Sequence, residues 1–413
     1  MEGRGGGGVS PPPPLPLHKK ETHVYLSIME TPLVKKIQNF SLETLNGGLR
    51  GERVILRIDT NTSLGEEGRV DKGEEWRILK MIPTIRFLQE QGARTVILAH
   101  QGRDPKESLR PIYDFLSQKI PLSFAQWNEL DSITGKLKEG ESVLLENVRF
   151  FHEEKEDNPS FLIPLVSWAD LYINEAFSVS HRKHASVHAI AQLLPSYFGF
   201  QFVREVRELS RFLTPLEEGE RVLILGGAKF GTKLPLIELM LKQNLADFIL
   251  LGGALANVFL KEKGIPIGDS YYDDSVDVTH IMNDSRILLP IDFRGKTGEA
   301  KMIEEVGDDA ILDIGPKTEE LFHNSIQKSE EALWNGPMGK YEDGYVEASV
   351  SIAKSVAESD TYGVSGGGDT STVILEQGLG GAFQFISTAG GAMLDFLVEG
   401  TLPGIEVVLK KKD

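Results

Sequence analysis

Short, continuous runs of apolar residues recur along the chain, and each ends in glycine or polar residues. Runs of this length and composition are typical of strands that are buried on both faces of a parallel sheet. We therefore predict strands at residues 54–58, 95–99, 143–146, 171–174, 222–225, 248–251, 332–334, 362–365 and 385–387.

Segments with the periodicity of amphipathic helices lie between these runs. The clearest are residues 77–88, 236–241 and 256–261. Regular alternation of strand and helix predicts βαβ units, and hence an α/β fold with doubly wound parallel sheets.

The predicted strands are too many for one comfortable sheet, so we expect two doubly wound, Rossmann-like domains. A boundary is expected after residue 195, because residues 195–199 precede a long amphipathic stretch at residues 201–213. We expect that stretch to form a helix that joins the domains at a hinge. The N-terminal domain would span residues 29–195, and the C-terminal domain, including the helix, residues 196–401.

The amino-acid composition excludes several kinds of partner and of catalytic chemistry. The chain has 413 residues, of which 40% are hydrophobic and 25% charged, which is ordinary for a globular protein of two or three domains. A formal net charge of -17 argues against nucleic acid or an anionic membrane as a partner, since both are held by surplus Lys and Arg. Cysteine is absent, which excludes disulfides, thiolate catalysis and Cys-bound metals.

Residues 1–28 have a different character from the rest of the chain. Glycine fills positions 5–8 and proline positions 11–14, which predicts a disordered N-terminal extension outside the fold. Met29 follows it, and the sequence leaves open whether the extension is native or an artefact. No run approaches the ~18 apolar residues needed to span a bilayer, so we expect a cytoplasmic protein.

Three predicted strand ends in the second half are rich in glycine and carry charged residues. They are residues 226–233, 334–342 and 366–370. Ligands of open parallel sheets bind at the carboxyl ends of the strands, where glycine allows backbone N–H groups to approach a phosphate and the next helix directs its positive end there. These loops predict a polyphosphate site.

Individual residues in these loops have competing interpretations. The segment ending in Lys233 is not a Walker A motif, because Leu234 stands where a hydroxyl residue would bind the metal. We expect Lys233 in the first turn of a helix capped by Thr232, where its positive charge opposes the helix dipole. A bound anion would explain why a cation stands at this position. Asp369 is either a helix N-cap or a magnesium ligand, or both. We expect Trp334 in the core, whereas Asn335 is within reach of a nucleotide.

Strand ends in the first half carry cations and hydrogen-bonding groups. They are Asp59, Asn61, His100, Arg103, Arg149 and the segment 181–184, with Arg77 nearby. Guanidinium groups match carboxylate and phosphate oxygens bidentately, so this half predicts a receptor for a small, multiply anionic molecule. Any one of these arginines taken alone is about equally well interpreted as a solvated surface residue.

Taken together, these motifs resemble the phosphoglycerate kinase family over nearly all of residues 35–409. The matching segments are the three glycine-rich loops and residues 57–61, 77–78, 99–103, 145–150, 174–177, 181–186 and 387–392. In that family the N-terminal domain holds 3-phosphoglycerate, the C-terminal domain holds MgADP or MgATP, and a hinge closes them across a cleft. The resemblance also implies that residues 402–413 return to the first domain.

The resemblance implies a role for each matching residue. The phosphoglycerate would be bound by Asp59, Asn61, Arg77, His100, Arg103, Arg149 and Arg182. The nucleotide would be bound by Lys229, Lys233, Asn335, Glu342, Gly367, Gly368, Asp369 and Thr370, with Asp369 also the ligand of Mg²⁺. Arg77 and Lys229 would be catalytic and flank the transferred phosphoryl group. The acceptor carboxylate is ionised at pH 7, so no general base is needed.

The resemblance further implies a monomer that interconverts 1,3-bisphosphoglycerate plus ADP and 3-phosphoglycerate plus ATP in glycolysis. A non-catalytic, nucleotide-binding paralogue with a regulatory or scaffold role is the alternative. Retention of both Arg77 and Lys229 favours the enzyme, because a binding module needs no cations directed at a transferring group. A Rossmann oxidoreductase is disfavoured, because no strict Gly-x-Gly-x-x-Gly follows a strand.

Several neighbours of the matching residues depart from the family pattern. The changed segments are residues 59–63, 100–104, 177–180, 229–233 and 389–391. Ala389 replaces a glycine, so its methyl group could hinder a close approach or a positive φ. Altered substrate affinity or rate is therefore expected even where the reaction is kept.

Overall fold

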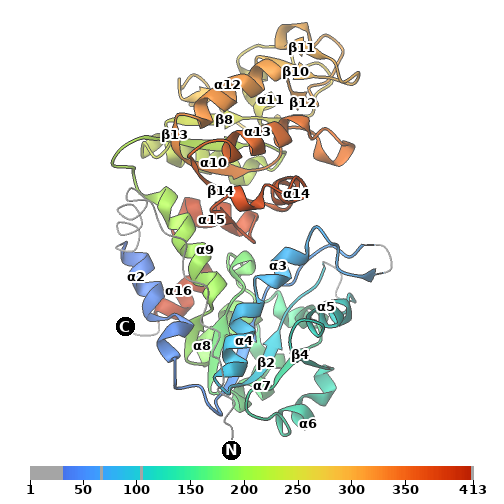
Figure 1. Cartoon of the computed structure of the whole chain (residues 1–413), viewed down its shortest axis with the longest axis vertical. Coiled ribbons are helices and arrows are strands. Elements are labelled where there is room, and N and C mark those ends of the chain that lie inside the picture. Colours follow the sequence, from blue (N-terminus) through green and yellow to red (C-terminus); the bar gives the residue numbers. More distant parts are fainter. Residues whose placement is uncertain (1–30, 66–67, 103–105, 411–413) are drawn as a thin grey trace, which may run out of the picture.

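The computed structural model describes residues 31–65, 68–102 and 106–410. The expected N-terminal extension at residues 1–28 and the predicted site residue Arg103 lie outside these ranges. Two parallel sheets form the centres of two domains, which follow one another along the long axis of the molecule (Figure 1). This architecture confirms the predicted α/β class with two doubly wound sheets.

The first domain is built on a six-stranded parallel sheet in the order β3-β4-β2-β1-β5-β6. Its strands are β1 (Arg53–Arg57), β2 (Arg94–Leu98), β3 (Ser123–Ala125), β4 (Ser142–Leu145), β5 (Leu171–Asn174) and β6 (Ser196–Phe198). Its helices are α2 (Pro32–Asn39), α3 (Glu75–Leu79), α4 (Ile82–Glu90), α5 (Arg110–Leu116), α6 (Leu130–Thr134), α7 (Ile163–Trp168) and α8 (Ile190–Leu193).

The second domain repeats this plan with the parallel order β15-β14-β13-β7-β8-β9. Its strands are β7 (Glu220–Leu225), β8 (Phe248–Leu251), β9 (Ile287–Leu288), β13 (Ser329–Asn335), β14 (Tyr362–Gly366) and β15 (Phe385–Ile386). Its helices are α10 (Phe230–Lys242), α11 (Gly253–Glu262), α12 (Pro316–Ile326), α13 (Glu347–Ala357), α14 (Gly368–Glu376) and α15 (Gly391–Glu399). A small antiparallel sheet adds β10 (Asp292–Arg294), β11 (Ala300–Met302) and β12 (Asp313–Ile314).

Alternate residues of each central strand face opposite layers, which is why these strands are apolar throughout. On β7, Leu223 packs into one buried cluster and Ile224 into the cluster on the other face. On β1, Ile55 and Leu56 likewise pack into two different buried clusters on opposite faces of the sheet. Burial on both faces removes the polar alternation that a half-exposed strand would show.

Helix α9 (Phe200–Ser210) connects the two domains (Figure 1). One continuous buried cluster runs from β2 through Phe202 of this helix to Leu223 of the second sheet. The ring of Phe177 in the first domain contacts Phe202 at 5.4 Å and Phe396 of α15 at 5.7 Å between centroids. The connection is therefore a packed core rather than a loose linker.

The last helix, α16 (Pro403–Leu409), leaves the second domain and packs against α8. The N–H of Gly404 donates to the carbonyl oxygen of Ser180 at 2.9 Å, which ties the two segments together. Within the described parts of the chain, no helix is long and apolar enough to cross a bilayer.

Two local expectations differ from the structure. The predicted helix at residues 77–88 is divided into α3 and α4, and Pro83 stands at the start of α4, where its missing N–H is tolerated. Strand β6 pairs with β5, so the first sheet extends to residue 198, past the boundary expected after residue 195. Tyr197 and Phe198 are typical strand residues, but flanking Pro195 and Gly199 gave the segment the pattern of a linker.

Candidate active site

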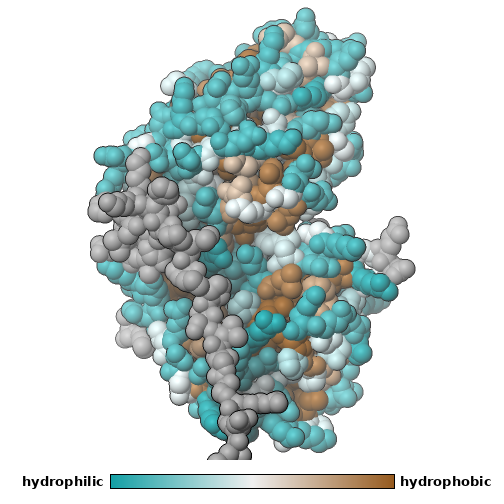
Figure 2. Space-filling model, viewed as in Figure 1, coloured by the Kyte–Doolittle hydropathy of each residue, from teal (hydrophilic) through white to brown (hydrophobic). Residues whose placement is uncertain are grey.

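Each sheet has one place where its strand order reverses, and such a point forms a crevice at the carboxyl ends of the strands. In the first sheet it lies between β1 and β5, and in the second between β7 and β13. The predicted loops begin at these strand ends. Figure 2 shows a notch between the two domains on the side where α3 and α14 approach each other.

In the first domain, hydrogen bonds join the loops that follow β1 and β2. Oδ1 of Asp59 accepts from the N–H of Asn61 at 3.1 Å, and Oδ1 of Asn61 accepts from the N–H of Gly102 at 2.9 Å. Arg149, from the loop after β4, donates to the carbonyl oxygen of Gly102. Nδ1 of His100 lies 4.0 Å from Oδ1 of Asp59. These four predicted residues therefore gather at one edge of the sheet.

The cations in this cluster repel one another. Burial and then the neighbouring charges of Arg57 and Arg182 lower the pKa of Arg149 to about 10. Burial and then Arg57, Arg149 and Arg182 lower the pKa of His100 well below its ordinary value. Arg182 itself is exposed and donates from Nε to Nε2 of His181 at 3.0 Å. An anion bound here would relieve this repulsion.

In the second domain, the loops after β7 and β13 are held in contact through their backbones. The N–H of Gly227 donates to the carbonyl oxygen of Pro337 at 2.8 Å. A β-carbon on Gly226 would lie 1.9 Å from that oxygen, so only glycine fits between the loops. The two strand ends thus form one continuous backbone surface.

Lys233 lies under this surface. It is 3% exposed, and its Nζ donates to the carbonyl oxygen of Gly226. Burial, and then the charge of Lys229, lowers the pKa of Lys233 to about 8. Lys229 is exposed at the start of α10, and its ammonium group has no hydrogen-bond or ion-pair partner within the described residues.

Two expected helix caps are wrong. Helix α10 begins at Phe230, so Lys229 takes the N-cap position and Thr232 donates to its carbonyl oxygen at 3.4 Å. Helix α14 is capped by Gly367, whose φ of +100° excludes most other residues. Asp369 is the second residue of that helix, is exposed and makes no side-chain capping bond. Its interpretation as an N-cap therefore fails.

The start of α14 is also bonded to the loop after β13. Oγ1 of Thr370 accepts from the N–H of Gly336 at 2.8 Å, and Nδ2 of Asn335 donates to the carbonyl oxygen of Gly366 at 2.9 Å. Trp334 is fully buried, as predicted. Glu342 is exposed in the short 3-10 helix Tyr341–Asp343 that follows the same loop.

Arg77 links the two halves of the site. It belongs to α3 of the first domain, and its Nη1 lies 3.3 Å from Oε2 of Glu74. Its Nη2 lies 3.1 Å from the position of a β-carbon on Gly368, the first residue of α14. Its neighbour Trp76 packs against the apolar cluster of the second domain. Helix α3 therefore carries Arg77 across to the start of α14 in the second domain.

The altered residues of this site adopt ordinary conformations. Among the described non-glycine residues, only Asp157 and Asn244 have a positive φ, so Ala389 does not need the backbone freedom of glycine. Its carbonyl oxygen accepts from the N–H of Gly367 at 3.2 Å. Phe230 is buried and stacks on Tyr271, with the ring centroids 6.3 Å apart.

Sequence reasoning missed several side chains that support the site. Oγ of Ser178 donates to Oδ2 of Asp59, and Glu205 of α9 accepts from Ser387 Oγ at 2.6 Å and from the N–H of Thr388 at 2.8 Å. Arg57 and Glu74 were also missed. Arg57 had a signal, since it is a charged residue at the end of an apolar strand, whereas Glu74 had none.

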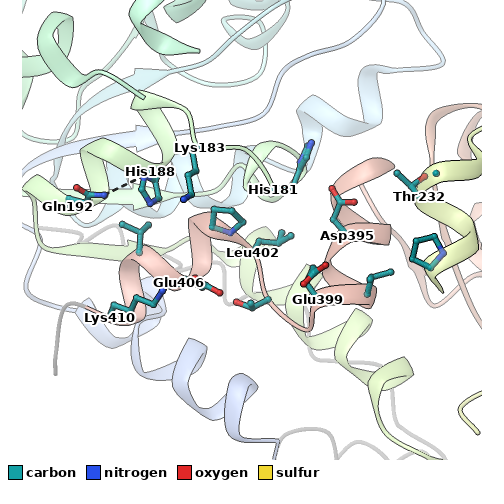
Figure 3. Close-up of a pocket in the computed structure, with 16 residues that line it drawn as sticks. His181, Lys183, His188, Gln192, Thr232, Asp395, Glu399, Leu402, Glu406 and Lys410 are labelled. Atoms are coloured by element: carbon teal, nitrogen blue, oxygen red, sulfur yellow. Dashed lines mark hydrogen bonds and ion pairs between the residues drawn. The ribbon is translucent and has the colours of Figure 1, made fainter. Parts of the chain in front are cut away.

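A cavity of about 780 Å³ lies elsewhere, between the first domain and helices α10, α15 and α16. Figure 3 shows His181 and Lys183 facing the helices that carry Asp395 and Glu406. The lining includes His181 and Lys183 of the predicted segment 181–184 and Gly231 and Thr232 of the predicted loop 226–233, but none of the residues to which the resemblance gives a binding or catalytic role. The cavity therefore borders two of the predicted strand-end segments.

Comparison with known proteins identifies the family. Residues 44–400 match the family model described as phosphoglycerate kinase. A phosphoglycerate kinase of Leptospira biflexa is 34% identical over 88% of this chain and 97% of its own length, and one of Methylorubrum extorquens is 36% identical over 88% and 96%.

Solved structures agree with this match. Phosphoglycerate kinase of Coxiella burnetii superposes with a TM-score of 0.75 at 30% identity, covering 90% of this chain and 98% of that chain. The enzyme of Pyrococcus horikoshii gives a TM-score of 0.76 at 29% identity, covering 89% and 98%. The chain is thus a glycolytic phosphotransferase with a carboxyl group as acceptor, and it belongs to the phosphoglycerate kinase family.

Proposed function

We propose that this chain transfers a phosphoryl group reversibly from 1,3-bisphosphoglycerate to ADP, with the phosphoglycerate on the first domain and the nucleotide on the second. The observation that carries this assignment is the position of Arg77. A cation from the first domain lies against Gly368, at the start of a helix of the second. Two reactants held on the two sides of the notch would meet at this guanidinium group.

The phosphoglycerate would bind at the carboxyl ends of β1, β2 and β4. The proposed ligands are Asp59, Asn61, Arg77, His100, Arg103, Arg149 and Arg182. Mutual repulsion among the described cations supports an anionic ligand, because a carboxylate or phosphate would offset part of their positive charge.

The nucleotide would bind where β7, β13 and β14 end. The proposed ligands are Lys229, Lys233, Asn335, Glu342, Gly367, Gly368, Asp369 and Thr370. Helices α10 and α14 both begin here, and the N-terminus of a helix attracts phosphate through its free N–H groups and its dipole. Buried Lys233 adds a positive charge beneath the same surface.

Magnesium would accompany the nucleotide, with Asp369 as its protein ligand. The carboxylate of Asp369 is exposed at the second residue of α14 and caps no helix. This suits Mg²⁺, which proteins commonly hold through one or two carboxylates while substrate phosphates and waters supply the other ligands. When bound, the ion would neutralise charge on the phosphates.

The chemistry requires positioning and charge stabilisation rather than proton transfer. The acceptor carboxylate of 3-phosphoglycerate is ionised at pH 7, so it needs no base. Arg77 and Lys229 would stabilise the negative charge on the equatorial oxygens of the phosphoryl group during transfer. Closure of the notch would exclude water, which otherwise competes as the acceptor.

We further propose that the enzyme acts as a cytoplasmic monomer. All the proposed ligands come from a single chain, so the site needs no second copy. The net charge of -17 supports neither nucleic acid nor an anionic membrane as a partner.

The test is ADP formation from MgATP and 3-phosphoglycerate, coupled to an aldehyde dehydrogenase that consumes the acyl phosphate. We expect turnover that requires both substrates and magnesium. MgADP binding without turnover would instead identify a non-catalytic paralogue. Turnover without added metal would contradict the role given to Mg²⁺.

A further inference from the structure

Arg57 is a charged residue inside the buried strand β1, and it is 1% exposed. Three of its nitrogen atoms have partners. Nε donates to Oγ of Ser186 at 2.9 Å, Nη1 donates to the carbonyl oxygen of Ile58, and Nη2 lies 3.0 Å from Nδ1 of His100. A buried guanidinium group with this many fixed contacts has a single orientation.

Its charge is balanced through Ser186. Glu154 is also 1% exposed, and its two carboxylate oxygens accept from Oγ of Ser186 at 2.7 Å and from the N–H of Ser186 at 2.8 Å. Ser186 therefore stands between a buried carboxylate and a buried guanidinium group. This chain of contacts, from Glu154 through Ser186 to Arg57, ends at His100.

The contact with Arg57 determines where His100 carries its proton. A guanidinium group has only donors, so the Nδ1 atom that faces it must be bare and accept. A neutral imidazole has one N–H, which must then be on Nε2. Within the described residues, Nε2 of His100 has no hydrogen-bond partner of its own.

We propose that Arg57 is a positioning residue that fixes His100 as the neutral tautomer protonated at Nε2, so that His100 presents a hydrogen-bond donor to an oxygen of the phosphoglycerate. The proposal extends the function proposed above, because it depends on the role of His100 in binding that substrate. It gives Arg57 a role in substrate binding although its side chain is buried behind the site.

The surroundings of His100 support a neutral ring. Arg57, Arg149, Arg182 and His184 disfavour a second proton, and burial does so more strongly. Asp59 is the nearby carboxylate, and at 4.0 Å from Nδ1 it is beyond hydrogen-bond distance. A neutral donor adds a directed contact to an oxygen without increasing the repulsion among the cations.

The direct test is nitrogen NMR of the histidine side chains in the ligand-free, full-length protein at pH 7. A His100→Gln variant identifies the His100 signals by their loss. We expect a protonated Nε2 and a bare Nδ1. A proton on Nδ1, or on both nitrogens, would overturn the proposal. Because no substrate is present, this result is independent of whether the chain catalyses phosphoryl transfer.

A second test removes the support of Arg57. In Ser186→Ala, Glu154 loses its hydroxyl link to Arg57, so the orientation of Arg57 should relax. We expect a mixture of His100 tautomers and a KM for 3-phosphoglycerate about tenfold higher, as for loss of one hydrogen bond, with a much smaller change in kcat. Ser167→Ala, which removes only a hydroxyl bonded to the carbonyl of Ile163, is the control. An unchanged tautomer together with an unchanged KM in a folded Ser186→Ala protein would contradict the positioning role.

Discussion

The Nη2 atom of Arg77 lies 3.1 Å from the position that a β-carbon on Gly368 would occupy, although the two residues belong to different domains. Helix α3 reaches this position partly because Trp76 packs on the apolar cluster of the second domain. The contact brings a cation of the first domain to the backbone of the second. It also makes Gly368 a place where one methyl group can be used to test the site.

We predict that Gly368→Ala lowers kcat about 10- to 100-fold, because small displacements of a catalytic group cost rates of this order. The added methyl would displace the end of the flexible Arg77 side chain, and Gly368 has no positive φ that alanine would strain. The melting temperature should therefore change little. Steady-state kinetics and thermal melting provide the measurement.

Gly381→Ala is the matched control, since a β-carbon there would have no atom within 4 Å. Equal kcat values for wild type and Gly368→Ala would show that the Arg77 contact does not matter for transfer.

Asp369→Ala should weaken ADP binding about tenfold, or ~1.4 kcal/mol, when magnesium is present. The loss of affinity should be much smaller when a chelator has removed the magnesium. The reason is the proposed role of Asp369 as a metal ligand, since its carboxylate caps no helix and is exposed at the start of α14. Calorimetric titration with and without magnesium measures both values. Asp360→Ala, at the opposite end of β14, is the control. Equal weakening in both conditions would eliminate Asp369 as a metal ligand.

ADP affinity should fall as the pH rises through about 8. The pKa of Lys233 in the ligand-free protein is lowered to about 8, so its ammonium group is charged below that pH and neutral above it. A polyphosphate binds the charged form, and deprotonation removes that attraction. The affinity should therefore be highest below pH 8.

Lys233→Met should bind ADP weakly at pH 7 and show a flatter pH profile than wild type. Lys242→Met, at the other end of α10, should keep the wild-type profile. If Lys233→Met retained the full decline above pH 8, another group would be responsible.

Ser178→Gly should raise the KM for 3-phosphoglycerate several-fold while leaving ADP binding unchanged. Oγ of Ser178 donates to Oδ2 of Asp59, and one hydrogen bond to a charged group contributes roughly 1.5–3 kcal/mol at most. Loss of this bond frees the carboxylate to rotate. Initial-rate kinetics with each substrate varied separately would measure the effect, and an altered KM for the nucleotide alone would count against it.

The central strands were the part of the fold that the sequence predicted best, because burial alone determines their pattern. Continuous apolar runs predicted every central strand from β1 to β15 except the short β3, β6 and β9, because burial on both faces leaves a strong pattern. Strands β10 to β12 form a small antiparallel sheet that is partly exposed, so their residues carry no such pattern.

Helix starts were less predictable, because neighbouring residues compete for the cap. Thr232 and Asp369 both have the chemistry of N-caps, but the structure gives that position to Lys229 and Gly367. The cap at Gly367 depends on a backbone conformation that no side-chain preference reveals. Supporting contacts such as Ser178 with Asp59 join residues more than a hundred positions apart, and only the fold brings them together.

In the proposed mechanism, the phosphoryl group passes between Arg77 of the first domain and Lys229 of the second. The most direct measurement is kcat for Arg77→Ala and Lys229→Ala, with exposed Arg50→Ala as the control and substrate binding measured in parallel. We predict that each of the two variants lowers kcat at least about a hundredfold with little loss of stability, as expected when charge stabilisation in the transition state is removed. Near-normal turnover in either variant would contradict this mechanism.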